Sequence, residues 1–296
     1  MIYLDKYGYQ PNEEKIAAAL KGIADNLSGL SSSEELKQCF SIMDLTTLSP
    51  DDTPESVGKL VEKVNKLPEA FPDYPAPASI CVYPNFASTV RSLKKDPEVH
   101  VTTVASCFPS AQSFLEVKVR ECELAVETGA DEIDIVLALN AFLAGDEARA
   151  FDEIVAMKNA IDKAAAAVGR KVVLKVILET GLLVAPDKIA EASFLAMEAG
   201  ADFIKTSTGK VSVNATPVAA YVMCEAIRRF YEVTGRRVDF KAAGGVSTAQ
   251  DAICYYHIVS GILGREWLNR ELFRFGVSRL GNNLMSAIEQ KTVNYF

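Results

Sequence analysis

The sequence predicts a single eight-stranded parallel α/β barrel, the (β/α)8 or TIM barrel, preceded by an N-terminal helical extension. Short apolar runs alternate with longer amphipathic stretches eight times along the chain, and this alternation is typical of parallel α/β folds. The chain has 296 residues, whereas such a barrel takes about 250 residues as one domain. We therefore predict an extension over residues 1–36 and a barrel with its C-terminal tail over residues 37–296.

The predicted strands are short runs rich in apolar and β-branched residues. Each run is too short for a buried helix and is bounded by polar or glycine-containing turns. The eight strands are Cys39–Leu45, Ala78–Val82, His100–Ser106, Glu132–Leu137, Lys171–Ile177, Asp202–Thr206, Val238–Ala242 and Leu272–Gly276.

Capping signals delimit the helices between these strands. Thr53 and Thr216 each precede a proline, which is the usual arrangement of a cap and a first helical turn. Gly129 and Gly200 follow helical stretches and close them before the next strand. The predicted helices are Thr53–Lys66, Asn85–Lys94, Leu115–Thr128, Ala148–Val168, Pro186–Ala199, Pro217–Thr234, Thr248–Leu263 and a last one from Leu280 to about Gln290.

Two further segments lie outside this alternation. In the extension, alanine-rich Glu13–Leu20 predicts a helix and Ser31–Glu35 predicts the start of another. The extension has three open roles: it plugs the barrel's bottom, flanks it, or contacts another subunit. Four prolines in Lys66–Pro77 predict a rigid surface connector between the first barrel helix and the second strand.

Composition and charge narrow the classes of partner. Hydrophobic residues make up 49% and the net charge is −8, so we expect a globular protein without a nucleic-acid surface. A small anionic substrate stays possible because it responds to the local field of a few lysines. Six scattered cysteines without a Cys-x-x-Cys pair predict reduced thiols and a cytoplasmic location. No signal peptide and no run of about 18 apolar residues is present, so we expect no membrane partner.

Histidine usage argues against two kinds of catalyst. The only histidines, His100 and His257, are far apart and lack the spacing of metal ligands. Neither lies in a motif that supports a Ser-His-Asp triad. We interpret both as solvated or structurally satisfied side chains.

Two lysines at strand ends carry the strongest chemical signal. Lys205 ends the sixth strand and Lys241 lies in the seventh, and functional residues of such barrels gather where the strands end. Burial and a second nearby cation both lower the pKa of a lysine, and a neutral amine attacks carbonyl carbons. Lys205 is the predicted nucleophile and Lys241 the charge that perturbs it. For an isolated lysine, an ordinary exposed strand end is the better interpretation.

The fourth strand offers two carboxylates on one face, Glu132 and Asp134. Asp134 is the candidate acid/base, acting through a water molecule. The alternative is a structural ion pair of these carboxylates with Lys175 or Lys241. We favour the structural pair for Glu132 and Lys175.

Glycines after strands six, seven and eight predict a phosphate site. Barrels of this class commonly hold phosphate in the loops after strands seven and eight, through backbone N–H groups and a helix N-terminus. The string around Lys210 is not a Walker A loop, because Val211 follows where Ser or Thr is needed. Arg279 adjoins the site and faces either the anion or solvent. The candidates are Gly209, Lys210, Gly244, Gly245, Gly276 and Ser278.

At these residues the chain resembles the deoxyribose-phosphate aldolases, which reversibly cleave 2-deoxy-D-ribose 5-phosphate into D-glyceraldehyde 3-phosphate and acetaldehyde in deoxynucleoside breakdown. The resemblance covers about residues 37–284. The matching stretches are Met43–Leu48, Gly129–Asp134, Leu174–Gly181, Gly200–Lys210, Asn214–Pro217, Phe240–Val246 and Arg274–Gly276.

The resemblance implies a role for each candidate. Lys205 matches the Schiff-base lysine, and Asp134 and Lys241 match the proton-relay pair. No metal or organic cofactor is expected, the ligands are a small phosphorylated sugar and acetaldehyde, and the assembly is a homodimer. Gly209, Gly244, Gly245, Gly276 and Ser278 fall at the phosphate, and Asp44, Thr46, Cys81, Thr208 and Lys210 fall in the substrate pocket.

Three departures from the family pattern stand out. Ala242 occupies a position where proline is usual, and Arg279 replaces a small hydroxyl residue. Some members use a C-terminal tyrosine for proton transfer, but here Tyr295 is penultimate. The other functions considered are a Schiff-base aldolase for a different phosphorylated sugar and a phosphosugar-binding barrel without turnover.

Overall fold

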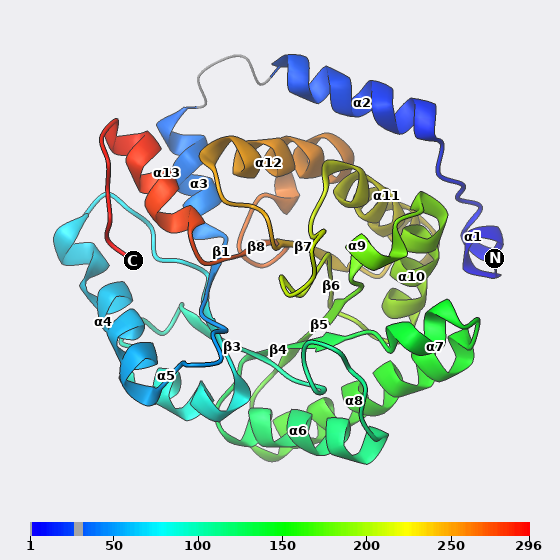
Figure 1. Ribbon diagram of the computed structural model, residues 1–296, viewed down its shortest axis with the longest axis horizontal. Coiled ribbons are helices and arrows are strands. Elements are labelled where there is room, and N and C mark those ends of the chain that lie inside the picture. The colour runs from blue at the N-terminus through cyan, green and yellow to red at the C-terminus, as the bar shows by residue number, and fades with distance from the viewer. Residues whose placement is uncertain (1, 27–31) are drawn as a thin grey trace.

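A computed structural model describes residues 2–26 and 32–296 of the chain. Within these residues eight parallel strands close into a barrel in sequence order, and helices surround it (Figure 1). The predicted fold class is thereby confirmed. The strands are β1 Met43–Thr46, β2 Ser79–Val82, β3 His100–Val104, β4 Glu132–Val136, β5 Val173–Ile177, β6 Phe203–Lys205, β7 Asp239–Ala243 and β8 Phe273–Val277.

The helices lie where the capping signals indicated, with additions. Short helices α1, α7 and α9 were not predicted, and α2 extends beyond the predicted Glu13–Leu20. The helices are α1 Ile2–Tyr7, α2 Glu13–Asn26, α3 Ser33–Ser41, α4 Pro54–Ala70, α5 Ala87–Leu93, α6 Leu115–Glu127, α7 Leu139–Leu143, α8 Glu147–Ala167, α9 Thr180–Leu183, α10 Pro186–Glu198, α11 Pro217–Thr234, α12 Ala249–Leu263 and α13 Leu280–Glu289.

The first predicted strand began too early, because Cys39 belongs to helix α3. Ser32 and Glu35 form a reciprocal capping box that starts this helix, which satisfies two backbone donors. Cys39 and Phe40 are buried on its inner face, so their apolar run imitated a strand. The helix crosses the proposed boundary at residue 36, and Ser31, part of the predicted helix start, lies outside the described residues.

The proline-rich connector is shorter than predicted, because α4 continues through Pro68 to Ala70. A proline removes one backbone donor, and near a helix end this loss affects only the last turn. The backbone N–H of Phe71 still closes the helix on the Leu67 carbonyl at 2.8 Å. Tyr74 is buried against Phe40, with 5.6 Å between ring centroids. The connector is therefore anchored into the core and does not only cross the surface.

The strand register places functional side chains in rows inside the barrel. Lys205 of β6 is paired with Lys241 of β7, and Asp134 of β4 is paired with Lys175 of β5. Intervening residues such as Ile204 point outward and pack in the main hydrophobic core. Because side chains alternate along a strand, the same pattern that buries apolar residues under the helices directs charged residues inward.

The described part of the N-terminal extension lies against the outer helices α10, α11 and α12 (Figure 1). Tyr7 of α1 stacks on Phe194 of α10 with ring centroids 4.4 Å apart. The buried carboxylate of Glu191 accepts the backbone N–H groups of Tyr3 and Leu4, which satisfies donors at the start of α1. The extension therefore flanks the helical ring, while its division from the barrel as a separate domain stays a prediction.

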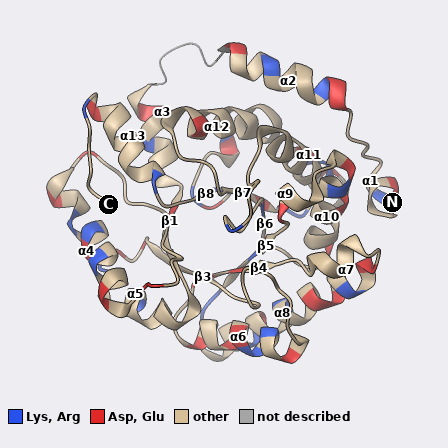
Figure 2. Cartoon of the chain, viewed as in Figure 1, with Lys and Arg blue, Asp and Glu red and all other residues tan. Residues whose placement is uncertain are grey.

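Acidic and basic side chains are mixed on the outer helices, as α4, α6 and α8 show (Figure 2). On α4, for example, Glu55 pairs with Lys59 and Glu62 pairs with Lys66, at 2.7 and 2.6 Å. Pairs four residues apart on an exposed helix face give small stabilisation. No helix in the described ranges is long and apolar enough to span a membrane.

Candidate active site

Lys205, Lys241 and Asp134 meet inside the barrel. The Nζ atoms of both lysines lie 2.8 Å from the same oxygen, Oδ2 of Asp134. The three residues come from β6, β7 and β4, and all three side chains are buried. The structure thus brings together the three residues that the sequence singled out as candidate catalytic groups.

The environment of Lys205 favours the neutral amine more than water does. Burial lowers its pKa below the usual lysine value, and the nearby charge of Lys241 lowers it further. The carboxylate of Asp134 acts in the opposite direction without cancelling the shift. Lys205 is therefore a candidate nucleophile that Asp134 also orients.

The pKa of Lys241 is shifted in the opposite direction. Burial alone would lower its pKa, but the carboxylates of Asp134 and Asp44 outweigh this effect and raise it. Its Nζ lies 2.5 Å from Oδ2 of Asp44 and 2.8 Å from Asp134. For Asp134, burial opposes ionisation, but Lys175, Lys205 and Lys241 together hold its pKa well below the usual value. Lys241 and Asp134 are therefore a fixed cation and anion beside the Lys205 amine.

A second layer of ion pairs lies beneath this group. Lys175 donates to Oδ1 of Asp134 at 3.0 Å and also hydrogen-bonds Glu132. The guanidinium of Arg274 pairs with two carboxylates, that of Asp44 at 2.5 Å and that of Glu132 at 2.7 Å. All of these groups are buried, so each charge needs its partners. The Glu132–Lys175 contact agrees with the structural pair that we favoured.

A cavity of about 700 Å³ opens above Lys205. Its walls come from the loops after β1, β6, β7 and β8, which is the rim where such barrels bind substrates. The residues that line it are Thr46, Thr47, Leu48, Ser49, Pro50, Lys205, Thr208, Gly209, Lys210, Ala243, Gly244, Gly245, Val246, Ser247, Gly276, Val277, Ser278 and Arg279.

Every predicted phosphate residue lines this cavity, and so do three of the five predicted pocket residues, Thr46, Thr208 and Lys210. Asp44 and Cys81 do not line it and are completely buried. Burial raises the pKa of the Cys81 thiol. Both residues belong to the layer under the cavity, where Asp44 contacts Lys241 and Arg274.

At two positions of the cavity wall only glycine fits, because neighbouring atoms lie too close for a side chain. A Cβ on Gly276 would lie 2.9 Å from Cε of Lys241, and one on Gly244 would lie 2.8 Å from the Asn214 side chain. Gly244 also has a φ of +76°, a backbone conformation that residues other than glycine rarely adopt. These positions keep the cavity floor open beside Lys241.

Arg274 and the loop Thr47–Pro50 belong to the site but were not predicted from the sequence. Arg274 lies two residues before Gly276 on β8, so both point inward by alternation. This alternation along the strand could have predicted that the charged side chain of Arg274 lies inside the barrel. The loop after β1 carried no signal, because its residues approach the cavity only when the barrel closes.

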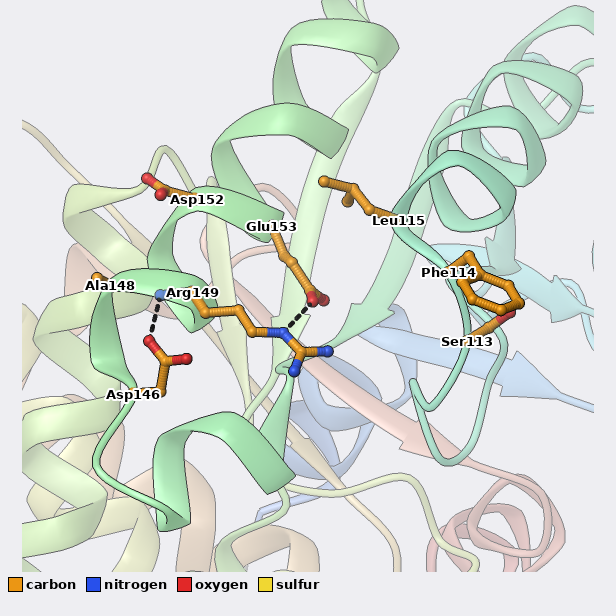
Figure 3. Close-up of a pocket in the computed structure, with 8 residues that line it drawn as sticks. All are labelled: Ser113, Phe114, Leu115, Asp146, Ala148, Arg149, Asp152 and Glu153. Carbon is orange, nitrogen blue, oxygen red and sulfur yellow. Dashed lines mark hydrogen bonds and ion pairs between the residues drawn. The ribbon is translucent and has the colours of Figure 1, made fainter.

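A separate surface cavity of about 520 Å³ lies between the starts of α6 and α8 (Figure 3). Arg149 contacts Glu153 there at 3.0 Å, and Glu153 also pairs with buried Lys118 at 2.6 Å. Phe114, 79% exposed, lies at its edge. This cavity contains none of the predicted site residues.

One further candidate lies apart from the cavity. Tyr295 donates its hydroxyl to the Lys63 carbonyl of α4 at 2.7 Å and packs on Phe71, so its side chain lies among the outer helices. Among the described residues no group of three or more His, Cys, Asp or Glu side chains forms a metal-binding cluster.

A closed α/β barrel with buried lysines under a rim cavity is an arrangement suited to a carbon–carbon lyase, and comparison with known proteins identifies the family. The family model described as "DeoC/LacD family aldolase" matches residues 39–263. The chain belongs to this family and is an aldolase. A Caenorhabditis elegans protein named "Putative deoxyribose-phosphate aldolase" is 40% identical over 280 residues, which cover 94% of this chain and 89% of that protein.

Solved structures agree in fold. A crystal structure named as a putative deoxyribose-phosphate aldolase from Toxoplasma gondii ME49 superposes with a TM-score of 0.72, at 24% identity over 87% of this chain and 95% of that one. The deoxyribose phosphate aldolase of Aeropyrum pernix, titled as having a unique tetrameric structure, gives 0.66 at 24% identity over 93% and 98%. At these identities the likeness extends to the fold alone.

Proposed function

We propose that this protein reversibly cleaves 2-deoxy-D-ribose 5-phosphate into D-glyceraldehyde 3-phosphate and acetaldehyde through a Schiff base on Lys205. The observation that carries the proposal is the buried Lys205 amine, which shares Oδ2 of Asp134 with Lys241 beneath a glycine-lined cavity. The 40% identity to the Caenorhabditis elegans protein supports the same substrate.

The proposed reaction uses these positions as follows. The neutral Lys205 amine attacks the C1 aldehyde of the open-chain sugar, and loss of water from the carbinolamine leaves an iminium ion. The C3 hydroxyl then loses its proton while the C2–C3 bonding electrons move toward the iminium nitrogen. This releases D-glyceraldehyde 3-phosphate and leaves an enamine on Lys205. Protonation of C2 and hydrolysis release acetaldehyde and restore the amine, so no metal ion is needed as an electron sink.

Asp134 and Lys241 are proposed as the proton relay. Asp134 touches the Lys205 amine directly, so it is placed to exchange protons with the carbinolamine through a water molecule. Lys241 stays cationic and keeps Asp134 ionised between turnovers. Asp44 holds Lys241 from below and is itself paired with Arg274.

The phosphate end is proposed to bind at the loops after β6, β7 and β8. Gly244, Gly245 and Gly276 allow backbone to approach the anion, and Ser278 and Lys210 add a hydroxyl and a charge. Thr46 and Thr208 border the space between this end and Lys205. Arg279 lines the same cavity and is proposed to add a second cation for the phosphate.

The biological setting is proposed with the substrate. A deoxyribose phosphate arises from deoxynucleoside breakdown, so we infer a catabolic enzyme of the cytoplasm. The predicted homodimer stays a prediction, which light scattering of the purified protein tests directly.

Trapping with borohydride tests the reaction. After incubation with acetaldehyde and reduction, we expect Lys205 to gain the mass of one ethyl group, whereas Lys205→Leu stays unlabelled and Lys59→Leu, a variant of an exposed lysine, labels normally. Absence of any adduct would favour a binding barrel without turnover. A screen with dihydroxyacetone in place of acetaldehyde separates this enzyme from a Schiff-base aldolase for another sugar.

A further inference from the structure

The loop after β6 is held by a buried carboxylate outside the proposed catalytic group. Glu179 follows β5 and is only 3% exposed. Its Oε2 accepts the hydroxyl of Thr208 at 2.6 Å, and its Oε1 accepts the backbone N–H of Thr208 at 3.2 Å. Both oxygens of one carboxylate therefore hold a single residue of the cavity wall.

The contact continues through Thr208 to Lys210. The backbone N–H of Lys210 donates to Oγ1 of Thr208 at 3.1 Å, and Gly209 between them has a φ of +79°. The ammonium of Lys210 then donates to the Leu48 carbonyl, 2.6 Å away in the loop after β1. This series of contacts runs from Glu179 to the opposite side of the cavity mouth.

The backbone at Glu179 is held in an uncommon conformation. Its φ of 55° and ψ of 58° are left-handed, which is costly for residues other than glycine and persists only where neighbouring structure enforces it. Thr180 donates its N–H to the Thr206 carbonyl at 2.9 Å. A Cβ on Gly181 would lie 1.9 Å from the Val213 carbonyl oxygen. The turn after β5 is thus held against the connection after β6 directly after Glu179.

The buried carboxylate of Glu179 differs from the other buried carboxylates in its partners. Within the described residues no Lys, Arg or His forms an ion pair with its carboxylate, unlike Asp44, Glu132 and Asp134. A buried carboxylate without a counter-ion opposes folding, and a neutral side chain of similar size would avoid this cost. The carboxylate does supply two acceptors to the Thr208 N–H and hydroxyl, which no apolar residue can replace.

We propose that Glu179 is a positioning residue that holds Thr208, Gly209 and Lys210 for the phosphate end of the substrate. The inference rests on the proposed function and concerns binding, because Glu179 does not touch Lys205, Lys241 or Asp134. Loss of Glu179 frees the turn at Gly209 and the ammonium of Lys210. The Lys205 amine remains in place.

The test compares substrates with and without phosphate. In Glu179→Ala we expect KM for 2-deoxyribose 5-phosphate to rise about tenfold or more, the effect of losing a hydrogen bond to a charged group. We expect kcat to change less than KM, and KM for unphosphorylated 2-deoxyribose and the labelling of Lys205 by acetaldehyde and borohydride to stay close to wild type. Glu179→Gln retains one acceptor and should recover part of the loss.

A double-mutant cycle with Thr208→Val tests the contact itself. Since both substitutions break the hydrogen bond between the Thr208 hydroxyl and Oε2 of Glu179, their effects on the KM of the phosphorylated substrate should not be additive. If Glu179→Ala does not fold, Glu179→Gln alone carries the comparison with a smaller expected rise.

The outcomes separate this inference from the function on which it rests. Equal losses on both substrates, or unchanged KM in a folded Glu179 variant, would overturn the positioning role while leaving the aldolase proposal intact. Failure of acetaldehyde and borohydride to label Lys205 in the unmodified protein would overturn the proposed function and this inference with it.

Discussion

Lys205 and Lys241 occupy the same row of adjacent strands β6 and β7, yet the pKa of Lys205 is lowered and that of Lys241 is raised. Both are buried and both touch Oδ2 of Asp134. The difference lies in Asp44, whose Oδ2 is 2.5 Å from Lys241. One lysine thus remains a cation and the other moves toward a free amine.

Replacing Lys205 removes the proposed nucleophile. We expect Lys205→Leu to lower deoxyribose-phosphate cleavage by about 10³-fold or more while the thermal unfolding transition survives. A coupled assay of D-glyceraldehyde 3-phosphate measures the loss, with Lys59→Leu as the control. Substantial residual cleavage would remove Lys205 from the mechanism.

Replacing Lys241 changes the pH dependence. Loss of this cation raises the pKa of Lys205, both directly and because Oδ2 of Asp134 then contacts Lys205 without sharing it with Lys241. For Lys241→Leu we therefore expect the rising limb of the pH–rate profile to move to higher pH, with the rate lowered by about 10²–10⁴-fold. An unchanged profile would show that the two lysines are not electrostatically coupled.

Adding one methyl group at Gly276 tests how tightly Lys241 is placed. The new Cβ would lie 2.8 Å from Cβ of Ala243 and 2.9 Å from Cε of Lys241, so the lysine has to move. We expect Gly276→Ala to lower kcat roughly 10–100-fold, as displacements of about 1 Å do in active sites. Gly261→Ala on α12 is the matched control, because no atom lies within 4 Å of its added Cβ. Equal activity in both variants would contradict the close placement.

Asp239 makes the stability depend on pH. Burial and then the charge of Asp202 raise its pKa to about 8, whereas an unfolded aspartate titrates at about 3.9. Between these values the folded state binds the extra proton, so this group's stabilising contribution is complete below about pH 4 and is lost as the pH rises to 8. The slope is at most ~1.4 kcal/mol per pH unit.

Asp239→Asn removes this titration. We expect the variant to gain in Tm relative to the unmodified protein as the pH rises from 5 to 8, measured by calorimetry in matched buffers. A constant difference in Tm across this range would mean that Asp239 does not titrate there.

The C-terminal tyrosine tests a departure from the family pattern. Because the Tyr295 hydroxyl is bound to the Lys63 carbonyl on α4, we expect Tyr295→Phe to change kcat by less than about twofold and to cost about 1 kcal/mol of stability at most. A large fall in the rate of proton exchange at acetaldehyde C2, followed by NMR in D₂O, would instead assign the tail a catalytic role.

Local sequence signals determined the order of elements and the candidate catalytic group. Caps such as Thr216 and strand-ending lysines such as Lys205 depend on neighbours in the chain, and alternation along β4 sets Asp134 inward. The same local reasoning failed at Cys39, whose apolar run packs as a helix face, and at Pro68, which the end of α4 tolerates.

Only the tertiary structure decided which buried charges pair and which residues line the cavity. Arg274 contacts Asp44 across 230 positions of sequence, and Lys241 contacts Asp134 across 107. Sequence separation of this size carries no signal, because barrel closure and strand register determine the distances. For the same reason the two acceptors that Glu179 offers Thr208 become visible only once β5 and β6 lie side by side.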